Sequence, residues 1–421
     1  MRATHCRMTS LWKLWLTVAA SRADRIAVID ADTGRTWNHR DLTSRAERIA
    51  STLEARIIPI CQPNNAAWLA TFLAIQKSRA AALPLDCSLT SEAQQQTLAR
   101  VPSTTHNVSC IKLTSGTTGE LNAIPCSASN LIADGEHIIR TMGIRPADRN
   151  LAVIPLGHSY GLGNLVMPLL LQGTSLVCAQ TFVPREILEL IEKYRVTVLP
   201  TVPAVLHALG QLQCVSKPPS LRLVISAGAP LSADVARQFH QRYGTKIHNF
   251  YGSSETGGIC YDGTGNATLS GRSIGKPLHD VAVRIRRDGR VSVSSRAGRA
   301  TLPDLAEWNR YGELRLLGRI GEVANIGGKK VSPAEVERAM RALGGVSDVW
   351  VAVAKDKRGN DCLTAAVETR RERADLEKEL LRVLPPWKLP RSWLIDPALP
   401  RTDRGKLHTA ELKARLNVSL P

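Results

Sequence analysis

The sequence predicts an α/β protein with a large N-terminal domain of mostly parallel sheets flanked by helices and a small α+β domain at the C-terminus. Short β-rich runs alternate with helical patterns between about residues 108 and 256, which is typical of parallel sheets covered by helices. The pattern changes after residue 319. With 421 residues and 43% hydrophobic content, the chain can bury the cores of two or three domains. We therefore expect an N-terminal domain over 1–319 and a C-terminal domain over 320–421.

The expected elements of the large domain begin with a helix. The apolar run from Leu11 to Ala20 is interrupted by Lys13, so it predicts an amphipathic helix rather than a secretory signal. The strands expected in the alternating region are 108–114, 151–155, 196–200, 221–226 and 246–251, and we expect them to form one mostly parallel sheet. One helical face between them is expected to carry Val183, Ile187, Leu190, Ile191 and Tyr194. Ligands of such folds bind outside the carboxyl ends of the strands, where the Gly, Ser and Thr-rich turns of this chain fall.

The small domain is expected to contain two helices and two strands. Ser332, Pro333 and Glu335 predict the N-cap, the first-turn proline and the capping box of a helix. The apolar face of that helix is expected at Val336, Met340 and Leu343. The elements expected after it are strands over 346–354 and 363–367 and a helix with an apolar face at Leu376, Leu380, Val383 and Leu384.

The net charge favours anionic partners. Lys and Arg number 55 against 37 Asp and Glu, which gives a formal charge of +18. The basic residues are interspersed with acids and lack the aromatic interleaving of a nucleic-acid groove, so nucleic acid is not expected as a partner. A nucleotide, coenzyme A or an acidic acyl carrier protein fits the charge. Solvated surface charge without a partner is the alternative.

The cysteine pattern and the hydropathy point to the cytoplasm. Nine cysteines are scattered and never spaced as CxxC, which indicates a reducing compartment and no zinc site. No segment reaches 18 consecutive apolar residues, so no transmembrane helix is expected, and peripheral membrane contact remains open.

The strongest single motif is a strand that leads directly into a turn rich in hydroxyl groups and glycine. Glycines allow backbone N–H groups to approach phosphate oxygens, and hydroxyl groups add donors without bulk. No lysine follows at the spacing of the GxxxxGK[ST] loop of kinase-like NTPases. The turn is interpreted as a phosphate cradle, with an ordinary turn as the alternative. Its residues are Thr114, Ser115, Gly116, Thr117, Thr118 and Gly119.

Four further motifs follow the cradle along the chain. They are the turn Ala227–Leu231, the segment YGSSETG over Tyr251–Gly257, Asp304 with Arg319 15 residues later, and the segment LPRTDRGK over Leu399–Lys406. With the TSGTTG cradle, this series resembles that of the adenylate-forming superfamily of acyl-CoA and aryl-CoA synthetases, peptide-synthetase adenylation domains and firefly luciferase. The resemblance extends over nearly the whole chain, and its residues 1–319 would correspond to the AMP-binding core.

The resemblance implies a nucleotide site for ATP. Tyr251 would stack on adenine, Asp304 would accept the ribose hydroxyls, and Ser254 would meet the α-phosphate. Glu255 would hold Mg²⁺, a hard cation that prefers oxygen ligands. The nucleotide-binding residues implied besides the cradle are Gly228, Ala229, Pro230, Tyr251, Gly252, Asp304 and Arg319.

The resemblance also implies catalysis by Lys406, together with Ser254 and Glu255. When a carboxylate attacks the α-phosphorus, a positioned ammonium stabilises the transition state more than the ground state. Without the resemblance, the basic segment that contains Lys406 would be interpreted as an exposed turn.

Members of the superfamily move the small domain between two poses about a hinge just after the arginine. One pose brings the lysine for adenylation and the other admits the thiol of a pantetheine. In this chain Gly327, Gly328 and Lys329 belong to a segment that resembles the lining of the thiol tunnel, where small residues leave room for the arm. A glycine-rich turn before a capped helix is the alternative for the same residues.

Two departures from the superfamily pattern bear on activity. Leu121-Asn122-Ala123 stands where related sequences carry Pro-Lys-Gly, so a cation near the leaving pyrophosphate is missing. The chain is also shorter than typical members, with losses before the cradle and around residues 262–300. A slow enzyme, substitution by another basic residue and a degenerate binding protein are all compatible with the first departure.

The acid site is expected around His158, Gly161, Gly228 and Gly257. His158 occupies the place at which amino-acid-activating members have an aspartate, which argues against an amino acid. Gly161 and Gly163 remove bulk at a helix start, which is compatible with a long acyl or planar aryl group. His158 is interpreted either as a gate to this site or as a buried histidine with a satisfied ring nitrogen.

The sequence thus predicts an ATP-dependent acid:thiol ligase. It would convert a fatty or aromatic acid into an acyl adenylate and transfer the acyl group to coenzyme A or to the phosphopantetheine of an acyl carrier protein. A degenerate, non-catalytic nucleotide- or acyl-binding protein is the alternative. No residue specifically indicates a luciferase-like reaction with oxygen.

Overall fold

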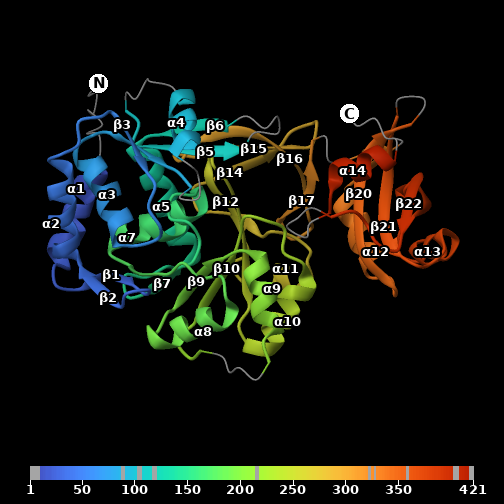
Figure 1. The fold of residues 1–421 in the computed structure, drawn as a ribbon, viewed down its shortest axis with the longest axis horizontal. Helices are drawn as coiled ribbons and strands as arrows, with labels where there is room; N and C mark the ends of the chain where they lie inside the picture. Colours follow the sequence, from blue (N-terminus) through green and yellow to red (C-terminus); the bar gives the residue numbers. More distant parts are fainter. Residues whose placement is uncertain are drawn as a thin grey trace. The chain divides into compact units, whose positions relative to one another are not determined.

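The chain forms two compact units (Figure 1). The computed structural model describes residues 10–86, 91–101, 107–115, 121–213, 218–320, 324–326, 329–356, 360–401 and 407–416. The first unit comprises Met1–Arg284, Ser292–Thr301 and Trp308–Arg315, and the second comprises Ile285–Val291, Leu302–Glu307 and Leu316–Pro421. The domain boundary expected at residue 319 stays a prediction.

The largest sheet in the described part of the chain has nine strands and lies in the first unit. Its strand order is β13(Lys276–Pro277), β12(Gly257–Tyr261), β11(Ile247–Ser253), β10(Leu223–Ser226), β9(Val198–Thr201), β7(Arg149–Ala152), β8(Ser175–Cys178), β1(Ile26–Asp30) and β2(Arg35–Asn38). The strands from β11 to β1 run parallel to their neighbours, and β12, β13 and β2 add antiparallel edges. This confirms the predicted, mostly parallel α/β fold.

The strand expected at 108–114 belongs to a different sheet from the other four expected strands. A four-stranded sheet has the order β3(Ile57–Ile60), β4(Ala81–Pro84), β5(Cys110–Ser115) and β6(Leu121–Cys126). The expectation of one sheet for all five strands was therefore wrong. The reason is that β5 pairs with the earlier strand β4 and turns back into β6, so none of its edges is left for β7. A further sheet has the order β14(Ala282–Ile285), β15(Arg290–Ser294), β16(Arg299–Trp308) and β17(Leu314–Arg319).

Helices cover the sheets of the first unit. The predicted first helix is confirmed as α1, which buries Leu11, Trp15 and Ala19 at a spacing of four residues. No helix in the described ranges is long and apolar enough to cross a membrane. The helical segments are α1(Leu11–Ser21), α2(His39–Ala50), α3(Ala66–Lys77), α4(Ser91–Arg100), α5(Ala128–Met142), α6(Ser159–Gly161), the π-helix η1(Leu162–Val166), α7(Met167–Gln172), α8(Pro184–Lys193), α9(Pro203–Gln211), α10(Ala233–Tyr243) and α11(Asn266–Ser270).

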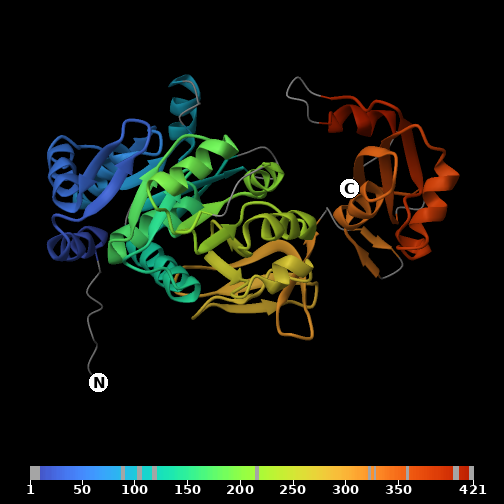
Figure 2. The same cartoon turned by 90° about the horizontal axis from the view of Figure 1, so that it is seen from below.

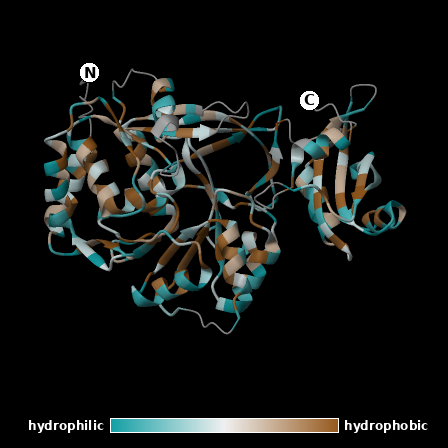
Figure 3. Ribbon diagram, in the orientation of Figure 1, coloured by the Kyte–Doolittle hydropathy of each residue, from teal (hydrophilic) through white to brown (hydrophobic). Residues whose placement is uncertain are grey.

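One apolar core joins α8, α9 and α10 to the parallel strands. These helices lie in the lower part of the first unit in Figure 1, and Figure 2 shows the molecule from below, from the side on which they lie. Ile187 and Ile191 of α8 are buried against residues of β7, β9 and β10, which are among the most hydrophobic segments in Figure 3. Val183 does not share this face as expected. It is the N-cap residue of α8 and is 51% exposed.

The second unit contains its own sheets and core. Its elements after residue 319 are β18(Ala324–Ile326), β19(Lys329–Val331), α12(Pro333–Arg341), β20(Val346–Lys355), β21(Asp361–Thr369), α13(Arg373–Leu380), the 3₁₀-helix η2(Pro386–Lys388), β22(Ser392–Asp396) and α14(Thr409–Arg415). The order β20-β21-β22 places the expected strands side by side, and Val336, Met340, Leu376 and Leu380 pack in one core against them.

Two details of the second unit differ from expectation. Ser332 is the N-cap of α12, but its side chain makes no cap hydrogen bond, so the predicted capping box is wrong. Glu335 instead accepts a hydrogen bond of 2.6 Å from Lys388, and this ion pair draws the carboxylate away from the helix start. Val383 is 65% exposed because α13 ends at Leu380, before the helical face can continue.

Candidate nucleotide site

The predicted phosphate cradle connects the two strands of an antiparallel hairpin, β5 and β6. Thr114 pairs with Asn122 and Ser115 with Leu121, so the two ends of the cradle segment are adjacent. Thr114 is half-buried, whereas Asn122 is exposed. The cradle residues Gly116, Thr117, Thr118 and Gly119 lie outside the described residues. Phosphate binding by this segment stays a prediction.

A tight turn between β11 and β12 carries the YGSSETG segment. The Oγ atom of Ser253 accepts a hydrogen bond of 3.2 Å from the Thr256 N–H and lies 3.0 Å from the Thr256 hydroxyl. Gly257 adopts a φ of 72°, a conformation that side chains disfavour. Tyr251 is half-buried on β11, and Gly252 is exposed beside it. The turn is therefore closed by its own short side chains.

Ser254 and Glu255 occupy the tip of this turn. The Ser254 hydroxyl lies 2.7 Å from that of Ser159 in α6, and the Ser254 carbonyl accepts a long hydrogen bond of 3.5 Å from Lys112. Glu255 is exposed, and no hydrogen bond or ion pair with another described residue occupies its carboxylate. An exposed carboxylate with open lone pairs suits a hard cation such as Mg²⁺. The arrangement thus fits the metal that the resemblance implies.

Two buried charged residues that the sequence analysis missed hold this turn from the protein interior. Lys112 of β5 and Asp134 of α5 are each only 4% exposed. The Oδ1 atom of Asp134 accepts a hydrogen bond of 2.8 Å from the Gly258 N–H. A Cβ on Gly257 would lie 2.2 Å from the same oxygen, so only glycine fits here. A lysine between two apolar residues of a strand, Ile111 and Leu113, was the available signal for Lys112, whereas Asp134 carries no motif.

The predicted Ala227–Leu231 turn follows β10 at the same edge of the sheet. Gly228 has a φ of 85°, and Gly228, Ala229 and Pro230 are exposed. The Tyr160 hydroxyl donates a hydrogen bond of 3.0 Å to the Ile225 carbonyl of β10, and the Tyr160 ring lies 5.8 Å from that of Phe250 in β11. Residues of three predicted motifs therefore meet outside the carboxyl ends of β10 and β11, where ligands of parallel sheets bind.

His158 and Gly161 begin the short helix of this region. His158 is exposed, so the interpretation as a buried histidine was wrong. A Cβ on Gly161 would lie 2.0 Å from the Pro155 carbonyl, and a Cβ on Gly163 would lie 2.8 Å from Ile138. The space that these glycines leave is filled by the protein itself, so they permit close packing rather than open a pocket. The π-helix η1 follows directly, a form often found at functional sites.

Asp304 and Arg319 form an ion pair in the second unit. Arg319 Nε lies 3.1 Å from Asp304 Oδ1, and the Asp304 side chain is only 13% exposed, against 54% for Arg319. The pair links β16 to β17 and orients the carboxylate. Ribose binding by Asp304 and nucleotide binding by Arg319 stay predictions.

The remaining predicted site residues of the second unit are not described. Lys406, Gly327 and Gly328 lie outside the described residues, and Lys329 begins β19 with no description of its side chain. Catalysis by the lysine and the thiol tunnel therefore stay predictions as well.

The fold is that of an α/β protein, and a family match over most of the first unit places the chain in the adenylate-forming superfamily. Residues 15–105 and 94–298 match the family described as "AMP-binding enzyme", and the chain belongs to this family.

Curated relatives are 27% to 28% identical to this chain over the residues that align. The "Probable CoA ligase CCL5" of Humulus lupulus is 28% identical over 71% of this chain and 62% of its own length. The "4-hydroxybenzoate--CoA/benzoate--CoA ligase" of Rhodopseudomonas palustris is 27% identical over 80% of this chain and 70% of its own length. The "Sulfoacetate--CoA ligase" of Cupriavidus necator is 27% identical over 71% of this chain and 65% of its own length. The chain thus spans less than two thirds of the length of two of these three proteins.

Solved structures match the fold over nearly the whole chain. ATP-bound MatB from Rhodopseudomonas palustris has a TM-score of 0.82 at 21% identity and covers 97% of this chain and 99% of its own. The o-succinylbenzoate coenzyme A synthetase MenE from Bacillus subtilis, in complex with AMP, has a TM-score of 0.82 at 21% identity, with 96% and 98% coverage. At such identities, these matches establish the fold.

Proposed function

We propose that this protein is an ATP-dependent acid:thiol ligase that forms an acyl adenylate from a fatty or aromatic carboxylic acid. The acyl group then passes to coenzyme A or to the phosphopantetheine of a carrier protein. The observation that carries the proposal is the Ser254–Glu255 tip, which exposes a carboxylate without a described partner at the carboxyl edge of a parallel sheet. ATP-bound and AMP-bound relatives of the same fold support the nucleotide.

The proposed reaction has two steps. A carboxylate oxygen of the acid attacks the α-phosphorus of ATP, and pyrophosphate leaves. A thiolate then attacks the acyl carbonyl, and AMP leaves with the electron pair of the broken bond. In the first step Ser254 would donate to an α-phosphate oxygen, Glu255 would hold Mg²⁺ against the phosphates, and Lys406 would stabilise the developing charge. Bound Mg²⁺ would supply charge neutralisation for the leaving pyrophosphate.

The proposed acid class rests on the segment from Pro155 to Gly161. This segment contains no acidic residue that could pair with the ammonium of an amino acid, and His158 is exposed at its centre. A relative described as a ligase of 4-hydroxybenzoate and benzoate supports an aromatic acid. Coenzyme A is the first acceptor proposed, because the relatives are described as CoA ligases. These substrates are consistent with a cytoplasmic enzyme.

ATP–pyrophosphate exchange with a panel of fatty and aromatic acids tests the proposal. We expect exchange that depends on both Mg²⁺ and one class of acid, followed by thioester formation when coenzyme A is added. Acid-independent binding of ATP, without exchange for any acid in the panel, would show a non-catalytic member of the family. That outcome is the one suggested by Asn122 in place of a lysine.

Replacement of Lys406 separates the two steps. We expect Lys406→Ala to lower the rate of adenylation by a factor on the order of 10² to 10³, because a charge aimed at the transition state is lost. Thioester formation from supplied acyl-AMP should stay within about threefold of wild type. Equal loss of both steps would contradict the proposed role of Lys406.

A further inference from the structure

A buried ammonium lies directly behind the tip of the proposed nucleotide site. Lys112 is 4% exposed, and its Nζ atom donates a hydrogen bond of 3.5 Å to the Ser254 carbonyl. Burial of a charged group is costly unless partners compensate it. A lysine in this place therefore calls for an explanation beyond the packing of β5.

Asp134 provides the opposite charge on the other side of the same turn. Burial raises the pKa of its carboxyl, whereas the charge of Lys112 and the hydrogen bond from Gly258 act in the opposite direction. Lys112 donates to the Ser254 carbonyl at the tip of the turn, and Asp134 accepts from the Gly258 N–H just after it, so the two residues hold the turn from the interior at two points. Gly257 and Gly163 let this carboxylate approach the two backbones closely.

The geometry of the Ser254–Glu255 peptide bond determines where the Glu255 N–H points. In a trans peptide the carbonyl and the following N–H point to opposite sides, and no described peptide bond is cis. Since the Ser254 carbonyl points to Lys112, the N–H of Glu255 points away from the interior. No hydrogen bond to another described residue uses this N–H. The Glu255 carbonyl is fixed too, because a Cβ on Gly298 would lie 2.2 Å from it.

We propose that Lys112 is a positioning residue that fixes the Ser254–Glu255 peptide so that its N–H binds a phosphate oxygen of the nucleotide. A backbone N–H held in this way is an anion-binding group, and it costs no reorganisation when the phosphate arrives. The Lys112 ammonium also places a positive charge within hydrogen-bond distance of the turn in a chain whose cradle segment has Asn122 instead of a lysine. The inference rests on the proposed function, and it concerns the nucleotide half of that site.

The competing interpretation is that Lys112 and Asp134 only compensate each other's charge in the interior and stabilise the fold, and two variants separate the interpretations. Lys112→Met removes the ammonium and leaves the Asp134 charge buried. Lys112→Met with Asp134→Asn removes both charges, while the amide oxygen introduced at position 134 can still accept from Gly258. A neutral buried pair is often as stable as an ionic one, so the double variant should recover most of the melting temperature. A structural role predicts that nucleotide affinity recovers with it.

The decisive measurement is the Kd of MgATP by calorimetry, which needs no turnover. We expect Lys112→Met and the double variant to bind MgATP about 10-fold more weakly than wild type, as for loss of a hydrogen bond to a charged group. Lys112→Arg keeps the positive charge in a bulkier group and should bind MgATP more tightly than Lys112→Met. Where Lys112→Met does not fold, the double variant and Lys112→Arg decide the question. A folded Lys112→Met or double variant that binds MgATP within about twofold of wild type would overturn the inference.

Arg222→Met is the matched control. Arg222 donates 2.8 Å to the nearly buried Asp148, at the start of β10 and away from the turn. This variant should lower the melting temperature but leave the Kd of MgATP unchanged. An equal loss of affinity in Arg222→Met would also overturn the inference, because affinity would then follow stability alone.

The two hypotheses fail in distinguishable ways. Absence of acid-dependent exchange in wild type, with MgATP binding still sensitive to Lys112, would reject the ligase and retain the positioning role. Exchange in wild type, with normal MgATP binding in Lys112→Met and in the double variant, would retain the ligase and reject the positioning role.

Discussion

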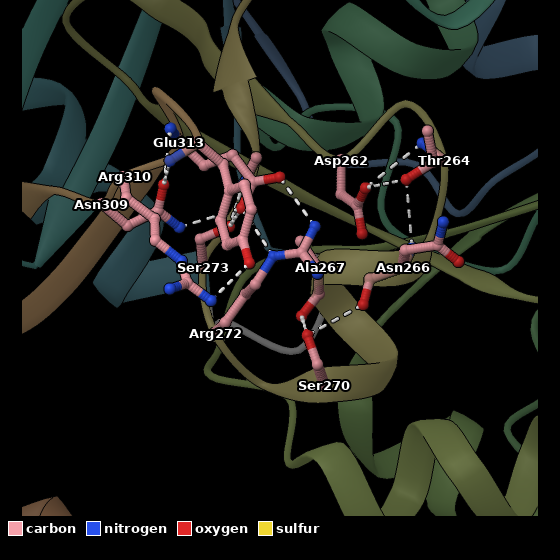
Figure 4. A network of polar contacts seen from close by, with 12 residues as sticks. Asp262, Thr264, Asn266, Ala267, Ser270, Arg272, Ser273, Asn309, Arg310 and Glu313 are labelled. Carbon is pink, nitrogen blue, oxygen red and sulfur yellow. Dashed lines mark hydrogen bonds and ion pairs between the residues drawn. The ribbon is translucent and has the colours of Figure 1, made fainter.

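Two polar clusters of the first unit use similar side chains, but one is closed and the other is open. The turn cluster consists of Lys112, Asp134, Ser159, Ser254 and Glu255, and its inner groups are paired while the Glu255 carboxylate is exposed without a described partner. The Asp262–Glu313 network, shown in Figure 4, turns both of its carboxylates inward. The carboxylates of the Asp262–Glu313 network stabilise the fold, whereas the Glu255 carboxylate is the group that we propose to bind a ligand.

The Asp262–Glu313 network satisfies its carboxylates fully. Asp262 accepts hydrogen bonds from the backbone N–H groups and hydroxyls of Thr264 and Thr268 and from the Gly265 N–H, at 2.7 to 3.2 Å. Glu313 accepts from Arg272 at two oxygens, and the other donors are Ser273 and Asn309. Carboxylates with this many donors stabilise a fold, and they have little capacity left for a substrate or metal.

Glu255→Gln should produce the largest change of activity. We expect the rate of adenylation to fall by a factor on the order of 10² to 10³, because a metal-binding charge at the reacting phosphates is lost. The free energy of unfolding should change by less than about 0.5 kcal/mol, as for most exposed positions. Exchange kinetics and chemical denaturation measure the two quantities. A strongly destabilised Glu255→Gln variant with a normal rate of adenylation would show that Glu255 stabilises the fold and does not act in the reaction.

Asp262→Ala should produce the largest loss of stability. Several buried donors lose their acceptor, so we expect the free energy of unfolding to fall by about 3 kcal/mol. Because the network lies outside the proposed site, kcat/KM of the folded fraction should stay within about threefold of wild type. Denaturant titration and exchange at a temperature well below the transition test this. Loss of kcat/KM comparable with that of Glu255→Gln would assign the network to the site.

Glu313→Gln should make stability less dependent on acid pH. Hydrogen bonds from Arg272, and further donors, lower the pKa of Glu313 to about 2 from an ordinary value of 4.5. A lowered folded-state pKa stabilises the protein above pH 4.5, and this contribution is lost as the pH falls toward 2. At about pH 7 the variant should lose roughly 2 to 3 kcal/mol, and its difference from wild type should shrink below about pH 4. A difference that stays constant across this range would contradict the shifted pKa.

Ser273→Ala should have the smallest effect of the series. Its hydroxyl donates a hydrogen bond of 2.8 Å to Glu313 and accepts one of 3.2 Å from the Gly275 N–H, while the other donors to the Glu313 carboxylate remain. We expect a loss of about 1 to 2 kcal/mol, the usual net contribution of two hydrogen bonds. Thermal and chemical unfolding against wild type measure it. A loss as large as that of Glu313→Gln would mean that the donors do not compensate for one another.

The fold was predictable because it depends on local patterns. The alternation of strands with helices and the spacing of Leu11, Trp15 and Ala19 follow from which faces are buried, and both are confirmed. The assignment of β5 to the large sheet failed, because the pairing of strands is a property of the whole chain and leaves no local signal. The capping box failed for a similar reason, because Lys388, which binds Glu335, is 53 residues away in sequence.

The motifs located the tip of the candidate site but not its support. Ser254 and Glu255 carry a recognisable pattern, whereas Asp134 contacts the turn from a position 124 residues away in sequence. The sequence also left the role of Gly161 open, because a glycine there could mark either a pocket or close packing. The Pro155 carbonyl, which a Cβ on Gly161 would approach to 2.0 Å, shows that it permits close packing. Support for a functional turn comes from tertiary contacts, and a sequence motif does not contain them.

A crystal structure of the protein with AMP and Mg²⁺ tests the central claim most directly. The account predicts an α-phosphate oxygen at hydrogen-bond distance from both the Ser254 hydroxyl and the Glu255 N–H, with the Ser254 carbonyl still directed at Lys112. A nucleotide bound away from the tip of the turn, or a Ser254 carbonyl rotated toward the phosphate, would contradict it.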